Sequence, residues 1–344
     1  MKHVLKVLAL AMLVALLLPS FAFAGGEGEV ADEDQTFSID VGLGLNDKSA
    51  QYASVEYFKE LVEERSDGRI TVEIYHSSAL GDDREMMEDL QVGALEMTCP
   101  STAPMVGFVP DFQVYDLPFL FPTAEAAFYT LDSEVGQDLL DQLADQGIIG
   151  LAYWDNGFRH LTNSVREVRL PEDVEGLKLR TMESPLHLAA WRQLGANPTP
   201  MAFGELFSAM QQGVVDGQEN PFGTIYLQSF FEVQDYVTDT GHIYSPFVFM
   251  ISKIFWDELP SDLQEIIAEA GVEAGEHNRE LNQEWNQDYR EELKDVMTVT
   301  ELTMDERMQW QEAVQPVYGE FEDEIGADLI QAVQDKVAEW QATQ

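Results

Sequence analysis

Apolar residues recur along the chain at two different spacings. In some segments every second residue is apolar, which is typical of strands, and in others the apolar residues recur every three to four positions, which is typical of helices. In the first part of the chain the pattern predicts strands over 36–43, 69–76 and 95–101 and helices over 50–64 and 83–92. This alternation indicates βαβ units and a mostly parallel sheet, so the chain belongs to the α/β class.

The remaining segments extend the same kind of pattern. We predict a helix over 124–146, strands over 148–154, 176–180 and 242–253, helices over 184–194 and 204–212, a long helix within 259–297, and two helices within 304–344. A chain of 344 residues exceeds the usual size of one hydrophobic core, so two lobes are expected. We assign 36–156 with 246–285 to lobe I, and 157–245 with 286–344, including the C-terminal helices, to lobe II.

The N-terminal segment has the features of an export signal. Lys2 and Lys6 precede an apolar run that is too short to cross a bilayer, and Ala22 and Ala24 form a small-x-small cleavage site. We therefore predict a cleaved signal peptide over 1–24, a disordered acidic leader over 25–35 and a periplasmic product without stable membrane insertion.

The chain is strongly acidic. It has 19 Lys and Arg against 63 Asp and Glu, a formal net charge of −44, which excludes nucleic acid and anionic membrane as partners. The acids are dispersed over every predicted helix. An acidic surface for a basic partner is one interpretation, and we prefer adaptation to concentrated salt, which screens the repulsion. Cys99 is the only cysteine, so an internal disulfide is excluded.

Arg180 is the leading candidate for a ligand-binding residue. It ends the predicted strand 176–180, and a planar guanidinium can hold a carboxylate through two parallel hydrogen bonds. A salt bridge to one of the many acids is the alternative. Few cations are available here, because no Lys or Arg occurs between Arg192 and Lys253. An aromatic residue, Phe203, and an amide, Asn220, are expected in loops close to Arg180.

Other candidates are less specific. Arg159 either contacts the anion or forms a hinge-stabilising ion pair, while Phe203 and Asn220 also suit the core and a turn. Acidic side chains could accept hydrogen bonds from sugar hydroxyls or simply be solvated. The acidic candidates are Asp83 and Glu183, and the neutral polar candidates near strand ends are Asn46, Gln51, Ser101 and Asn156.

The sequence offers little for catalysis. It lacks HExxH, G-x-S-x-G, a phosphate loop and a dinucleotide fingerprint, and its six histidines form no close pair on a helix face. We therefore predict no catalytic residue, no cofactor and no metal. A lyase acting on a sugar acid is the competing class of function.

Several blocks of sequence resemble the solute-binding subunits of tripartite ATP-independent periplasmic (TRAP) transporters. The blocks are GLKLR (176–180), GANPTPMAFGE (195–205), GVVDGQENP (213–221) and the segments 62–104, 116–123, 155–164 and 259–267. The resemblance implies two α/β lobes with a hinge and two crossings, a long helix that spans both lobes, and a membrane permease as partner. It also implies that Arg180 clamps the substrate carboxylate.

The identity of the ligand is a separate expectation. Sialic-acid binders of this family carry an acidic residue and an arginine where this chain has Ser101 and Pro104, which argues against that substrate. The mixture of two arginines with many acceptors and amides favours a hydroxylated monocarboxylate, a hexuronate before an aldonate. A C4-dicarboxylate is the alternative.

Overall fold

Two long antiparallel strands, β4 (Ile148–Asn163) and β8 (Tyr236–Ser252), form the middle of the sheet in the computed structural model, which describes residues 35–344. The sheet has nine strands in the order β2-β1-β3-β8-β4-β7-β5-β6, and β9 also pairs with β8. The shorter strands are β1 (Phe37–Gly42), β2 (Ile70–Tyr75), β3 (Met97–Thr98), β5 (Lys178–Thr181), β6 (Asn197–Pro200), β7 (Gly217–Asn220) and β9 (Thr298–Glu301). The predicted signal peptide and nearly all of the predicted leader lie outside the described residues.

The long strands connect two groups of parallel strands. β1 pairs with β2 and β3 in one group, and β5 pairs with β6 and β7 in the other. β3 and β7 join these groups to β8 and β4 by antiparallel pairing, so the sheet is mixed rather than mostly parallel. A register shift between Asp155 and Gly157 interrupts the β4–β8 ladder opposite Ser245 and Pro246. The lobe boundaries at 156/157 and 245/246 stay a prediction.

Helices flank the sheet. The α-helices are α2 (Ala50–Arg65), α3 (Asp83–Val92), α4 (Thr102–Met105), α5 (Ala124–Leu131), α6 (Glu134–Gln142), α7 (Pro185–Gln193), α8 (Leu206–Gln211), α9 (Phe222–Leu227), α10 (Lys253–Glu258), α11 (Ser261–Leu293), α12 (Met304–Ile325) and α13 (Ala327–Ala342). Short 3-10 helices are η1 (Pro110–Asp116), η2 (Leu143–Gln146), η3 (Pro171–Val174), η4 (Phe203–Glu205) and η5 (Phe230–Glu232). Within residues 35–344, no helix combines the length and apolarity needed to cross a bilayer.

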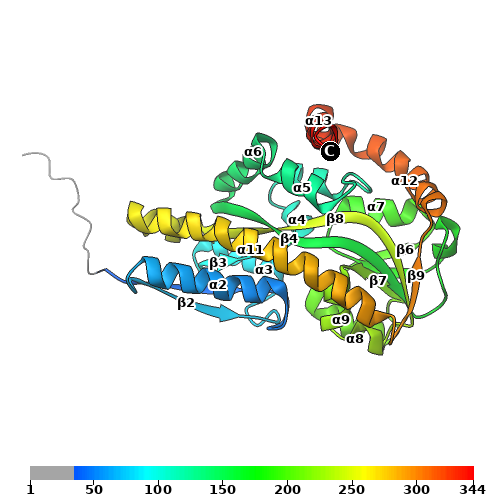
Figure 1. Cartoon of the computed structure of the whole chain (residues 1–344), viewed down its shortest axis with the longest axis horizontal. Coiled ribbons are helices and arrows are strands. Elements are labelled where there is room, and N and C mark those ends of the chain that lie inside the picture. Colours follow the sequence, from blue (N-terminus) through cyan, green and yellow to red (C-terminus); the bar gives the residue numbers. More distant parts are fainter. Residues whose placement is uncertain (1–34) are drawn as a thin grey trace, which may run out of the picture. The chain divides into compact units, whose positions relative to one another are not determined.

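Helix α11 runs across β4 in the middle of the sheet and contacts α2 and α9, which lie beside the two strand groups (Figure 1). In the first half of α11, Glu273 accepts a hydrogen bond from Tyr57 of α2, and in the second half Asn286 accepts one from the backbone of Gly223 in α9. Between these points Trp154 of β4 lies against Gly275, where a Cβ atom would come within 2.8 Å of the indole. The long helix expected from the sequence is therefore present and is held along its length.

Several predicted elements have different bounds. The predicted helix 124–146 is divided into α5, α6 and η2, because the Ser133 side chain caps a new helix and Gly136 passes against the Leu131 carbonyl. The predicted helix 204–212 is divided into η4 and α8, and the strand expected over 95–101 is only β3. Two strands, β6 and β7, lie in segments expected to be loops, so Asn220 ends a strand and Phe203 begins η4.

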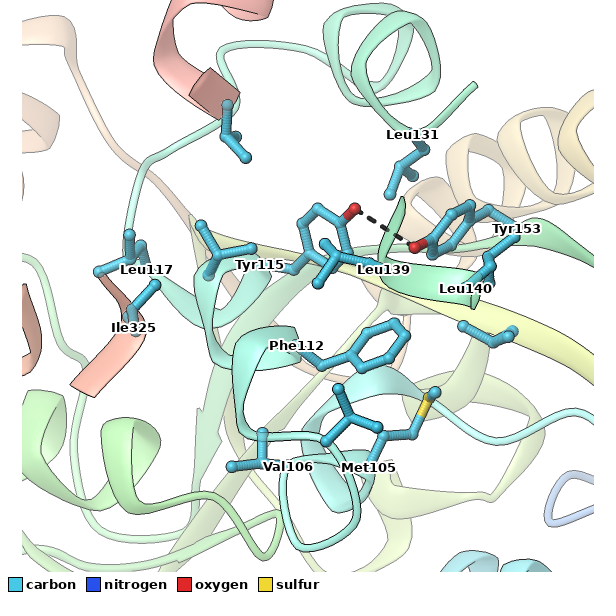
Figure 2. Close-up of a cluster of buried hydrophobic side chains, with 14 of the residues drawn as sticks. Met105, Val106, Phe112, Tyr115, Leu117, Leu131, Leu139, Leu140, Tyr153 and Ile325 are labelled. Carbon is cyan, nitrogen blue, oxygen red and sulfur yellow. Dashed lines mark hydrogen bonds between the residues drawn. The ribbon is translucent and has the colours of Figure 1, made fainter. Parts of the chain in front are cut away.

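The largest apolar cluster lies on one side of the sheet. Figure 2 shows part of it, where η1, α5 and α6 bring Phe112, Leu131 and Leu139 together beside Tyr115 and Tyr153. The hydroxyls of these two tyrosines lie 3.3 Å apart. A second cluster packs α2 and α11 against β1 and β2. Rigid packing on both sides of β4 and β8 holds the strand ends that carry the polar candidates.

Candidate ligand-binding site

A cavity lies where the ends of strands from both groups meet. Nine of the ten residues predicted from the sequence line it: Gln51, Asp83, Ser101, Asn156, Arg159, Arg180, Glu183, Phe203 and Asn220. The tenth, Asn46, lines a smaller neighbouring cavity, and its amide nitrogen donates to the Leu227 carbonyl at 2.9 Å.

Arg180 is a buried cation without an ion pair in residues 35–344. It lies in β5, only 2% exposed, and its Nε donates to the Met201 carbonyl at 2.9 Å. Its two terminal nitrogens make no hydrogen bond within the described part of the chain. Burial lowers the pKa of the guanidinium to about 10, and the nearby Arg159 charge adds to this decrease. Arg180 therefore stays charged at neutral pH and can accept an anion from the cavity.

Arg159 is also buried at the cavity, but it already has a partner. Its Nη2 donates to Glu219 Oε1 at 2.9 Å, and its Nε donates to the other carboxylate oxygen. His242 Nε2 lies 3.3 Å from the same carboxylate. Burial alone would raise the pKa of Glu219, yet the charge of Arg159 and the hydrogen bond from His242 hold it well below its usual value. The ion-pair alternative for Arg159 is therefore present in the structure.

Glu219 is a residue of the site that the sequence reasoning missed. It precedes Asn220 in β7, and its side chain is fully buried. The available signal was an acid inside QENP, near the middle of a segment without any Lys or Arg. A strand was needed to show that Glu219 faces β4, where Leu161 is its backbone partner and Arg159 lies two residues earlier.

Amides and aromatic rings complete the cavity. Asn220 donates to Gln218 Oε1 at 2.5 Å, and Asn156 Nδ2 lies 3.4 Å from Ser245 Oγ. Phe203 is half-buried and lies against Phe230, with ring centroids 6.3 Å apart. Glu183 lines the cavity but is exposed to solvent. Among residues 35–344, no three His, Cys, Asp or Glu side chains gather as metal ligands would.

Asp83 faces the arginines from the opposite wall. It begins α3, where Asp82 and Glu85 form a capping box, and its Oδ2 lies 3.4 Å from the Ser101 backbone nitrogen. Burial raises the pKa of the Asp83 carboxyl to about 6 from an ordinary value of 3.8, although the Arg180 charge opposes the increase. The cavity therefore presents a cation and a carboxyl of weakened acidity on opposite sides.

The raised pKa of Asp83 predicts a pH-dependent effect on stability. The folded protein disfavours the ionised carboxylate, so the contribution of Asp83 to stability is complete below about pH 4 and is lost as the pH rises through about 6. We expect Asp83→Asn to be more stable than wild type at pH 7.5 by about 1 to 2 kcal/mol, after allowance for partial exposure. Urea unfolding at pH 7.5 and pH 4 measures this difference. An unchanged difference at the two values would contradict the assignment.

Comparison with known proteins identifies the family. The model of the bacterial extracellular solute-binding protein, family 7, matches residues 41–324. The chain belongs to this family. The resemblance to TRAP solute-binding subunits is thus confirmed at the level of the family, and the expected two-lobe periplasmic binding protein fold is confirmed with it.

Three relatives of this family-7 chain are informative. The C4-dicarboxylate-binding periplasmic protein DctP of Rhodobacter capsulatus is 39% identical over 285 residues, which cover 82% of this chain and 85% of the relative. The sugar acid binding protein of Advenella mimigardefordensis, solved with galactonate, is 38% identical with a TM-score of 0.87 and covers 89% of this chain and 99% of that one. A TRAP periplasmic solute-binding protein from Sulfitobacter sp., solved with β-D-galacturonate, is 31% identical with a TM-score of 0.83 and covers 87% and 100%.

Proposed function

We propose that this protein is exported to the periplasm, captures a small organic acid and delivers it to the membrane subunits of a TRAP transporter. The observation that carries the proposal is Arg180, a buried cation at a cavity with no acid paired to it in residues 35–344. An unpaired buried charge is costly, and a ligand carboxylate removes that cost. The relatives that bind galactonate, galacturonate and C4-dicarboxylates support the ligand class.

Within this class we propose a hydroxylated monocarboxylate, a hexuronate before an aldonate. Two arginines at one cavity suggest two carboxylates, but Glu219 neutralises Arg159. Arg84 also lines the cavity, and it is exposed and paired with Glu88 at 3.1 Å. Among the described residues, Arg180 is therefore the lining cation that lacks an acidic partner. Asp83, Asn156 and Asn220 are suited to hydroxyl groups.

A direct titration tests the ligand class. We expect D-glucuronate or D-galacturonate to bind the wild-type protein more tightly than succinate or malate, because a second carboxylate would be buried without a cation. Isothermal calorimetry with the four acids under one buffer condition gives the order. Tighter binding of succinate or malate would favour the C4-dicarboxylate alternative, which the Rhodobacter capsulatus relative supports.

A binding role rather than an enzymatic one is part of the same proposal. Arg180 and Asp83 could in principle serve a sugar-acid lyase, the competing class of function. The family consists of solute-binding proteins, which supports binding. Incubation of the protein with galacturonate, followed by NMR of the ligand, distinguishes the two classes. Turnover above the uncatalysed rate would contradict the proposal.

We also propose that the acidic composition adapts the protein to concentrated salt. With a net charge of −44, self-repulsion opposes folding in dilute buffer, and added salt screens it. The melting temperature is therefore expected to rise between about 0.1 and 2 M NaCl, over which the Debye length falls from about 10 Å to below 3 Å. A flat or falling curve would leave an acidic docking surface as the better explanation.

A further inference from the structure

Asp155 lies where the pairing of β4 with β8 is irregular, and its side chain faces away from the ligand cavity. The next residue, Asn156, lines that cavity, whereas Asp155 lines a separate groove whose walls include α11 and α12. We propose that Asp155 is a positioning residue, which holds Asn156 at the ligand cavity by tying this part of β4 to β8 and α11. This inference rests on the proposed function, which makes that cavity the ligand-binding site.

The sheet itself holds this point weakly. Asp155 is opposite Pro246 in the ladder, and a proline has no backbone N–H to donate. The register shifts between Asp155 and Gly157, and Gly157 has a positive φ. Asn156 Nδ2 lies 3.4 Å from Ser245 Oγ, which is long for a hydrogen bond. Contacts from outside the backbone ladder are therefore needed to fix Asn156.

Asp155 supplies such contacts to both neighbours of the strand. Its Oδ1 accepts a hydrogen bond from the Tyr244 hydroxyl of β8 at 2.8 Å, and its backbone nitrogen donates to Asn278 Oδ1 of α11 at 2.6 Å. All three residues are buried, with exposed fractions of 2% or less. One turn further along α11, Asn282 lies against the same carboxyl. Asp155 is thus connected to β8 through its side chain and to α11 through its backbone.

Helix α11 also holds the two residues before Asp155. Arg279 Nη2 donates to the Tyr153 carbonyl at 2.9 Å, and Trp154 Nε1 donates to the Gly271 carbonyl at 3.0 Å. Asp155 is therefore the last of three consecutive residues of β4 that bond to α11. The cavity residue follows it directly, so a loss of the Asp155 contacts should first loosen the segment that lines the cavity.

The contacts of Asp155 depend on its ionisation. Burial raises the pKa of the carboxyl to about 6 from an ordinary value of 3.8, although Asn282, Tyr244 and the charge of Arg279 oppose the increase. An ionised carboxylate only accepts hydrogen bonds, whereas protonation turns one oxygen into a donor that faces these donors. The charged and titratable groups that face the carboxyl are Tyr244 of β8, Arg279 of α11 with its partner Asp132, and Glu125 of α5.

The experiment measures D-galacturonate binding at pH 7.5 by the wild type, Asp155→Asn, Asn156→Ala and the double variant. Burial already disfavours the charge of Asp155, so Asp155→Asn should fold, and we expect it to weaken binding roughly 3- to 10-fold. In the Asn156→Ala background the same replacement should have an effect of less than about twofold, because the positioned side chain is already missing. Glu284→Gln is the matched control, since it removes an exposed acid from the same groove and should leave the affinity unchanged.

The dependence on pH distinguishes positioning from a general structural effect. At pH 5 wild-type Asp155 is mostly protonated, so the difference in affinity between the wild type and Asp155→Asn should largely disappear. Asp83 titrates in the same range, but both proteins contain it, so its effect cancels in the ratio of affinities. An equal loss at both pH values, or a loss that persists in the Asn156→Ala background, would overturn the proposal.

A measurement without ligand separates this inference from the proposed function. Amide hydrogen exchange over residues 154–158 should be faster in Asp155→Asn than in the wild type at pH 7.5, and the two proteins should not differ at pH 5. Identical exchange at pH 7.5 would overturn the positioning of Asn156 whether or not an acid binds. If no organic acid binds the wild type while the exchange differs as expected, the proposed function fails, and Asp155 still holds Asn156 in place.

Discussion

Replacement of Arg180 by lysine is expected to weaken binding of the organic acid by roughly 30- to 150-fold, or about 2 to 3 kcal/mol. The guanidinium uses Nε to bond the Met201 carbonyl, which leaves both terminal nitrogens for a bidentate contact with a carboxylate. Lysine has one nitrogen at the end of a flexible chain, so it cannot bond Met201 and hold two carboxylate oxygens in a plane. Calorimetric titration of galacturonate measures the loss.

Arg84→Lys is the control for this variant. Arg84 lines the same cavity, but it is exposed and its guanidinium is paired with Glu88, so its replacement should change the affinity by less than threefold. An affinity of Arg180→Lys within threefold of wild type would remove Arg180 from the clamp role. Unfolding curves of both variants should stay close to the wild-type curve, which separates a binding effect from a folding defect.

The sequence was most informative where one residue type was scarce. Arg180 stands out because 60 residues without a cation follow Arg192, a fact that needs no coordinates. The distinction between Arg180 and Arg159 could not be made in the same way. Both arginines occupy strand positions near the cavity, and only the pairing of β4 with β7 shows that Glu219 lies beside Arg159 and leaves Arg180 free.

The long strands illustrate a second limit. The sequence predicts a strand that ends at Trp154, with a lobe boundary at 156/157. In the structure β4 continues through these residues with a register shift, and Gly157 takes a φ of 111°. The predicted end at Trp154 is therefore wrong, because the continuation of β4 depends on pairing with β8 far along the chain.

The position of Asn282 also depends on contacts between distant segments. Gln51 was a candidate from its position after the first strand, whereas Asn282 lies in a long helix whose polar residues are mostly solvated. Only the packing of α11 against β4, α2 and α9 places Asn282 near Gly157 and the smaller cavity. A single sequence predicts the helix but not which of its polar residues face the interior.

Arg159→Met is expected to destabilise the folded protein by about 3 to 5 kcal/mol, in contrast to the replacement of Arg180. Glu219 is fully buried, and removal of its partner would leave the carboxylate without an arginine ion pair, with His242 Nε2 at 3.3 Å and the charge of Arg180 further away. The double variant Arg159→Met/Glu219→Gln removes both charges, so it should recover most of the lost stability. Urea denaturation at pH 7.5 measures both values.

The comparison with Arg180→Met completes the test. Arg180 has no ion pair in the described residues, and burial already disfavours its charge, so Arg180→Met should keep the wild-type stability or exceed it while losing ligand binding. Arg159→Met should instead lose most of its folding stability, and this loss should be larger than any effect on ligand affinity. If Arg159→Met unfolds within 1 kcal/mol of wild type, Glu219 does not depend on the pair. Glu219 would then not neutralise Arg159, and the preference for a monocarboxylate would be wrong.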